Sequence, residues 1–133
     1  MDSSDVNPDS VVGALEPVVK YVTVEKARLY TEDRGSGPPV LIVGAADEDA
    51  EIYRGVAERL ADTYRVVTYD RRGTGRSDSA GWPSDSVRHA DDAAKVIQDL
   101  NLEGATVLGA SAGGIVALRL ALRHPEMVTT VLC

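Results

Sequence analysis

A serine flanked by small residues is the part of this chain best suited to chemistry. The pattern Gly-Ala-Ser-Ala-Gly occupies residues 109–113, after an apolar run at 105–108 and before a stretch of small and apolar residues. A serine held at a sharp turn between a strand and a helix needs neighbours without bulk, so that both elements approach closely while its Oγ points outward. We therefore interpret Ser111 as a candidate nucleophile at a nucleophile elbow, in preference to a turn that serves packing alone.

The elements around this serine alternate between strand and helix patterns. Strands are predicted at residues 18–24, 27–31, 39–43, 65–69, 105–108 and 128–133. Helices are predicted within 47–64, 86–101 and 112–124, and the Gly-, Ser- and Pro-rich residues 73–86 are predicted to form a loop. This alternation predicts an α/β fold, with a mostly parallel sheet and helices on both of its faces.

The apolar positions predict which helix faces are buried. In the first helix they are Ile52, Tyr53, Val56, Ala57 and Leu60, and in the second they are Ala90, Ala93, Ala94, Ile97 and Leu100. The third helix is apolar almost all round, which predicts burial on every side, and Pro125 ends it. The turn at Glu25-Lys26 lacks the glycine that tight hairpins favour, so the sequence leaves its geometry open.

Three segments in order resemble the α/β-hydrolase superfamily. Residues 35–44 resemble the entry into its third strand and oxyanion loop. Residues 66–78 contain Asp-Arg-Arg-Gly and then Gly-Arg-Ser, similar to the family's strand-and-loop signature. Residues 91–126 contain the serine pattern and a helix-ending His-Pro-Glu. The resemblance covers about residues 20–133 and implies an α/β-hydrolase fold, here truncated after about strand six.

The resemblance implies an acyl-enzyme mechanism on Ser111. An oxyanion hole needs two backbone N–H groups, which the resemblance assigns to Ala112 and, after strand three, to Ala45. Val43 stands where the family often has a histidine that helps to fix this loop. A carboxylic ester is the default substrate, while amides, lactones, epoxides and cofactor-free peroxidation remain open.

The family's triad order is serine, then acid, then histidine, and this chain does not supply it. His124 lies 13 positions after Ser111, which is about 20 Å along a straight helix, so we interpret His124 and Glu126 as structural. His89 precedes the serine, and we interpret it as a solvated residue at the start of a helix away from the elbow. We therefore expect the triad acid and histidine to lie in C-terminal sequence outside the chain, and the chain alone to be inactive.

Length supports the same interpretation. The chain has 133 residues, whereas the resembled fold usually takes about twice that length, and it stops within the apolar run 128–133. We expect residues 1–17 to be a disordered or loosely attached tail and residues 18–133 to be the N-terminal part of a hydrolase domain. The last strand would leave a free apolar edge through which copies of the chain could associate.

Composition limits the partners. A net charge of −7 argues against nucleic acid and anionic membranes, which need a basic surface; we expect a small-molecule substrate instead. The N-terminus has no apolar signal segment, and one cysteine, Cys133, fits a reducing compartment, so we expect a cytoplasmic protein. No Cys/His cluster has zinc spacing, and we expect no metal and no cofactor.

Some alternatives stay open at this point. The glycines at 109, 113 and 114 resemble a dinucleotide fingerprint, but Ile115 stands where close approach of the pyrophosphate needs glycine. A second alternative is a non-catalytic relative that binds a ligand or partner on the same scaffold. The aspartate beside two arginines, Asp70-Arg71-Arg72, could indicate an anion site, but Asp70, Arg72, Gly73 and Ser77 are interpreted more simply as a tight turn with a local ion pair. Tyr53 and Trp82 could line a pocket or cover the core.

Overall fold

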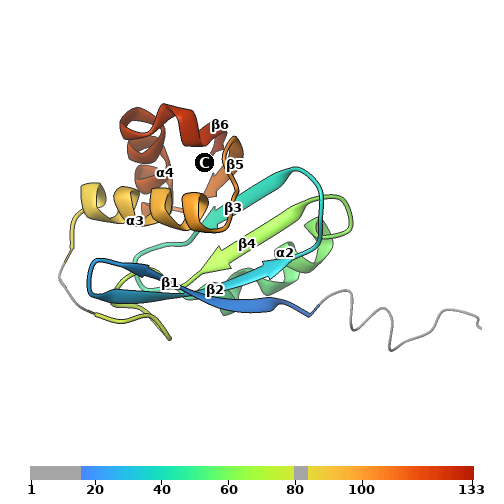
Figure 1. The fold of residues 1–133 in the computed structure, drawn as a ribbon, viewed down its shortest axis with the longest axis horizontal. Helices are drawn as coiled ribbons and strands as arrows, with labels where there is room; N and C mark the ends of the chain where they lie inside the picture. Colours follow the sequence, from blue (N-terminus) through green and yellow to red (C-terminus); the bar gives the residue numbers. More distant parts are fainter. Residues whose placement is uncertain (1–15, 80–83) are drawn as a thin grey trace, which may run out of the picture.

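A six-stranded sheet organises residues 16–79 and 84–133, the part of the chain described by this computed structural model (Figure 1). The strand order is β1-β2-β4-β3-β5-β6. The strands are β1 (Val18–Val24), β2 (Ala27–Arg34), β3 (Pro39–Val43), β4 (Arg65–Tyr69), β5 (Ala105–Gly109) and β6 (Val128–Leu132). The helices are η1 (Ala50–Tyr53), α2 (Arg54–Leu60), α3 (Ser86–Asp99), α4 (Ala112–Arg123) and η2 (Pro125–Met127). Most of the predicted tail, and Trp82, lie outside the described residues.

The sheet is parallel from β4 to β6 and antiparallel at β1 and β2, which confirms the prediction of a mostly parallel sheet. Strand β3 lies between β4 and β5, with Val40 opposite both Val66 and Thr106. Its apolar run is buried because both of its edges are paired and both of its faces are covered. At the hairpin between β1 and β2, Glu25 itself takes the left-handed conformation, with φ of 56°, in place of the missing glycine.

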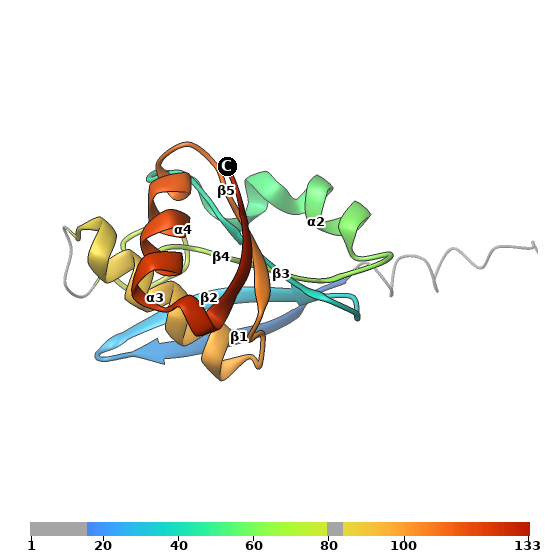
Figure 2. The ribbon, with the colours of Figure 1, turned by 90° about the horizontal axis from the view of Figure 1, so that it is seen from above.

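Helices cover both faces of the sheet, as predicted (Figure 2). On one face, Ala57 of α2 packs with Val40, Ile42 and Val66. On the other face, α3 and α4 pack against the sheet and against each other. The main core on that face contains the five inward positions predicted for the helix at 86–101, which are Ala90, Ala93, Ala94, Ile97 and Leu100.

Two helix predictions were wrong in part. The segment predicted within 47–64 forms a short 3-10 helix followed by a seven-residue α-helix, and Ile52 and Val56 are 60% and 50% exposed. Helix α4 is not buried all round, since Ile115, Leu118 and Leu122 are exposed. The sheet and α3 contact only one side of α4, so apolar residues on its other side stay in contact with water. No helix within the described ranges is long and apolar enough to cross a membrane.

Candidate active site

Ser111 lies at the junction of β5 and α4, in a backbone conformation that side chains rarely adopt. Its φ is 54° and its ψ is −119°, and the residue is exposed. A non-glycine residue held in such a conformation costs of order 1–3 kcal/mol, and strain of this kind is concentrated at functional sites. The turn presents Ser111 at the N-terminus of a helix, as the sequence pattern predicts for a nucleophile elbow.

The glycines on either side of Ser111 are required by backbone contacts. A Cβ on Gly109 would come within 2.6 Å of the Gly113 oxygen, and a Cβ on Gly113 would overlap the carbonyl oxygens of Val43 and Gly44. The Ala110 amide also donates a hydrogen bond to the Val43 oxygen over 3.0 Å. The elbow is therefore packed directly on the end of β3, which explains why its neighbours must be small.

The two amides assigned to an oxyanion hole are in different situations. Ala112 is the first residue of α4, where N–H groups lack intrahelical acceptors and the helix dipole favours negative charge. Ala45, in the loop after β3, donates its N–H to Oε1 of Glu48 over 3.1 Å. The same carboxylate oxygen accepts a hydrogen bond from the Tyr53 hydroxyl. In this structure the Glu48 carboxylate thus accepts the hydrogen bond of the Ala45 amide, which the resemblance assigns to the oxyanion hole.

The contact between Tyr53 and Glu48 changes the acidity of both groups. The Tyr53 hydroxyl, followed by the Ala45 amide, lowers the pKa of Glu48 below its ordinary value. Burial, followed by the hydrogen bond to Glu48, raises the pKa of Tyr53 to about 12. At neutral pH the tyrosine is therefore a donor and the glutamate an anionic acceptor, which keeps the loop closed on itself.

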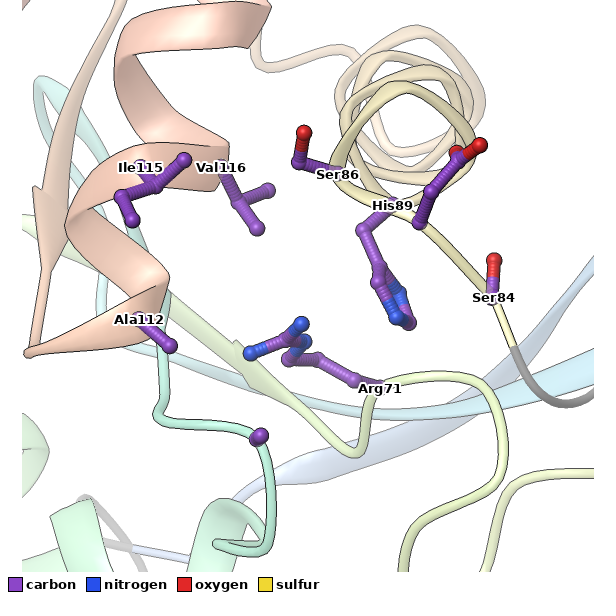
Figure 3. A pocket seen from close by; sticks show the side chains of 9 residues that line it. Arg71, Ser84, Ser86, His89, Ala112, Ile115 and Val116 are labelled. Atoms are coloured by element: carbon purple, nitrogen blue, oxygen red, sulfur yellow. The ribbon is translucent and has the colours of Figure 1, made fainter.

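The placement of His89 corrects the sequence interpretation. The residue is 5% exposed rather than solvated, because the first turn of α3 packs against the loop after β4. Its ring faces a hollow of about 190 Å³ that is also bordered by Ala112, next to Ser111 (Figure 3). Burial, followed by the positive charge of Arg71, lowers the pKa of His89 to about 4. His89 is therefore uncharged at neutral pH, and it lies on the elbow side of α3 rather than away from it.

His124 lies apart from the elbow, in a cluster at the other end of α4. Its Nε2 is 2.8 Å from Oδ1 of Asp91, which also pairs with the Arg123 guanidinium over 2.9 Å. These contacts tie the end of α4 to α3, as a structural interpretation of His124 requires. Within residues 16–79 and 84–133, neither histidine is hydrogen-bonded to Ser111.

The loop after β4 joins several elements around the site. It contains a tight turn, in which the Thr74 amide donates a hydrogen bond to the Arg71 oxygen over 2.9 Å, but the Arg72 ion pair reaches α3 and is not local. Buried Asp70 accepts a hydrogen bond from the Ala50 amide over 2.7 Å and pairs with Arg76 rather than with the adjacent arginines. Arg72 pairs with Asp92 of α3 over 2.8 Å, and both side chains are almost fully buried. This loop therefore fixes η1 and α3 relative to the sheet.

The adjacent residue, Arg71, reaches the loop after β3. Its Nη1 donates a hydrogen bond to the Gly44 carbonyl oxygen over 2.9 Å, and its side chain is 5% exposed. Figure 3 shows its guanidinium in the hollow between α4 and α3. Because β3, β4 and β5 are parallel, their carboxyl ends bring Gly44, Arg71 and Ser111 to one edge of the sheet.

Tyr53 borders a second hollow on the α2 face of the sheet and also packs against the core of that face, so it fits both of the roles that the sequence left open. The hollow has a volume of about 280 Å³ and extends past Ala110 to Cys133. The elbow thus lies between two hollows, since Ala110 borders one and Ala112 the other. In the part of the chain that the structure describes, no group of three or more His, Cys, Asp or Glu residues is arranged to hold a metal ion.

Comparison with known proteins settles the family. A model of the alpha/beta hydrolase fold family matches residues 38–132. The chain belongs to the α/β-hydrolase family. It is 40% identical over 109 residues to an uncharacterised hydrolase, YraK, of Bacillus subtilis (strain 168), which covers 79% of this chain and 40% of that protein. The chain spans about 40% of the length of the curated relatives it matches.

Solved structures agree with this family. An esterase from Exiguobacterium antarcticum superposes with a TM-score of 0.80 and 32% identity, over 86% of this chain and 44% of that one. Est816, described as an N-acyl homoserine lactone degrading enzyme, superposes with a TM-score of 0.78 and 30% identity, over 82% of this chain and 42% of that one. The predicted family and fold class are confirmed.

From the sequence, His89 is considered but interpreted as solvated, and neither Arg71 nor Glu48 is assigned to the site. A usable signal existed for Arg71, because it lies two positions after the end of a parallel strand, and the carboxyl ends of parallel strands line binding crevices. For Glu48 no signal existed, since its contact with the Ala45 amide depends on how the loop after β3 turns.

Proposed function

We propose that this chain is the nucleophile-bearing part of a serine hydrolase that cleaves carboxylic esters or related acyl bonds. Ser111 attacks the carbonyl carbon, the leaving alcohol departs, and water later releases the acyl group from Ser111. The observation that carries the proposal is the strained, exposed conformation of Ser111 at the N-terminus of α4. The position of the Ala112 amide at that helix end supports a role in stabilising the negative oxygen of the tetrahedral intermediate.

The proposed oxyanion site and the similar proteins both favour an acyl bond as the bond that is cleaved. Backbone amides at a helix N-terminus stabilise the oxyanion formed when an ester or amide carbonyl is attacked. The similar structures include an esterase and an enzyme that degrades N-acyl homoserine lactones, and a lactone is a cyclic ester. Both support an acyl substrate of small-molecule size.

The proposal assigns the triad acid and base to residues other than those described here. Neither His89 nor His124 is bonded to Ser111, and His89 is a weak base because burial lowers its pKa to about 4. Loss of a triad histidine typically costs several orders of magnitude in rate. We therefore expect residues 1–133 alone to turn over a nitrophenyl ester far more slowly than ordinary esterases do.

A fluorophosphonate probe tests the nucleophile directly. Incubation of the full-length protein, which would carry the triad acid and histidine, with the probe, followed by peptide mass spectrometry, should place the adduct on Ser111. Ser111→Ala should abolish it, whereas Ser79→Ala, at another exposed serine, should not. Equal labelling of the wild-type chain and Ser111→Ala would contradict the assignment and favour a non-catalytic binding protein.

A further inference from the structure

Arg71 is a buried cation without an acidic partner in the described ranges. Its neighbour Arg72 pairs with Asp92. Among the described residues, the only group that accepts a hydrogen bond from the Arg71 side chain is the Gly44 carbonyl oxygen, which is neutral. Its Nε is buried and has no hydrogen-bond partner in the same residues. A buried charge that no opposite charge compensates is costly to a fold, so a bound anion would relieve a cost that the structure carries.

Two helix N-termini border the same hollow as Arg71. Ser86 is the first residue of α3 and Ala112 the first of α4, and both line the hollow (Figure 3). The N-terminal end of a helix carries a partial positive charge and presents free N–H groups. The guanidinium and both helix ends therefore favour negative charge at one place.

The other polar residues of the hollow are compatible with an anion. His89 is uncharged at neutral pH and can still donate one N–H group. The Ser84 Oγ has no hydrogen-bond partner among the described residues. Asp85 is the one acidic residue in the lining, but it is exposed and its carboxylate accepts the Arg88 amide over 2.9 Å as the cap of α3.

We propose that this hollow is a binding site for a small carboxylate, with Arg71 as the residue that recognises its charge. A volume of about 190 Å³ has room for a carboxylate of three or four carbons, since a water molecule occupies about 30 Å³ of liquid. The site lies beside Ala112 and does not depend on hydrolysis. If the proposed function holds, it selects acyl substrates that carry a second, ionised carboxyl group.

Propionate is the probe for this site. Its binding to the chain is measured by calorimetry and by the side-chain Nε–H resonances of the arginines in NMR spectra. Arg71→Gln should weaken propionate binding at least tenfold, equivalent to about 1.4 kcal/mol. Arg119→Gln removes the same charge from an exposed position of α4 and should change binding less than twofold. Ser111→Ala should bind propionate normally, which separates this proposal from the proposed hydrolase function.

A second pair of variants leaves the contact between Arg71 and Gly44 intact. Ile115 lines the hollow and is 58% exposed, so substitution there is tolerated by the fold. Ile115→Glu should weaken propionate binding by repulsion, and Ile115→Gln, of nearly equal size, should not. The proposal is overturned if propionate does not bind saturably, if Arg71→Gln leaves its affinity unchanged, or if Ile115→Glu and Ile115→Gln behave alike.

Discussion

The Glu48 carboxylate accepts a hydrogen bond from the Ala45 amide, with 3.1 Å between Oε1 and the amide nitrogen. An oxyanion in that position would have to displace the carboxylate, and the Tyr53 hydroxyl stabilises the carboxylate where it is. The loop after β3 therefore has two competing acceptors for one donor. Which acceptor is bound depends on the charge of Glu48, and this charge can be measured.

Tyr53→Phe should raise the pKa of Glu48 towards its ordinary value of 4.5, because the Tyr53 hydroxyl is the largest cause of its lowering. A carboxyl group whose pKa is lowered in the folded state stabilises the fold above its unfolded pKa, and this contribution is lost as the pH falls through the lowered value. In Tyr53→Phe this contribution should therefore be smaller, and its loss should be complete at a higher pH. Carbon-13 NMR titration of the carboxyl group measures the shift, and Tyr64→Phe is the control. An unchanged titration of Glu48 would contradict the role of Tyr53.

Ser111→Gly should be more stable than Ser111→Ala by about 1 kcal/mol. Glycine removes the strain of the positive φ, worth of order 1–3 kcal/mol, and gives back roughly 0.5–1 kcal/mol in chain entropy. Urea unfolding of the two variants measures the difference. At Ser79, where φ is not positive, the glycine variant should be the less stable one. The same order at both positions would show that the elbow is not strained.

Gly113→Ala should destabilise the fold by about 3 kcal/mol. Its new Cβ would overlap backbone oxygens of Val43 and Gly44, and backbone atoms cannot move aside as a side chain can. Gly55→Ala is the matched control in α2, because a Cβ added there would meet nothing within 4 Å; it should stabilise by roughly 0.5–1 kcal/mol. Equal effects in thermal unfolding would argue against close packing of the elbow on β3.

Asp92→Ala should cost about 3–5 kcal/mol, because it removes the buried carboxylate that pairs with the Arg72 guanidinium. Asp99→Ala breaks the pair with Lys95 in the same helix. That pair is exposed, so its loss should change the free energy of unfolding by less than about 0.5 kcal/mol. Chemical denaturation of both variants gives the comparison, and similar losses would mean that Arg72 finds another acceptor.

The edge strand β6 should make the isolated chain associate. Within the described sheet β6 pairs only with β5, and Leu132 is 51% exposed. We expect aggregation, partial unfolding or oligomers in size-exclusion chromatography, and Leu132→Lys should reduce the association. A monodisperse wild-type monomer with a cooperative thermal transition would contradict this expectation.

Sequence patterns predicted the strands and helices well where one physical requirement dominated. The run 39–43 could only be a strand covered on both faces, and the alanines of α3 could only face the core. Patterns failed where burial depends on a neighbour. Apolar residues at Ile52 and Leu122 predicted core positions, yet no element of the described structure covers them.

The candidate site, like the fold, could be predicted from the sequence only in part. Small residues around Ser111 are a local requirement of the turn, so the elbow and its serine could be found from the sequence. The positions of His89 and Glu48 depend on which elements pack together at the end of the sheet, and sequence spacing does not contain that information. The sequence therefore predicts a solvated His89, although the side chain is buried between its own helix and the hollow beside the elbow.

The elbow is held by contacts between main-chain atoms: Gly113 against β3, and the Ala110 amide on the Val43 oxygen. Main-chain atoms are the same whatever the residue, so mutations at hollow-lining positions such as Ile115 leave the serine where it is. Selection can thus change the residues that line the hollow while the Ser111 side chain keeps its place. For a laboratory evolving new substrate preferences, this divides the molecule into positions to randomise and positions to leave alone.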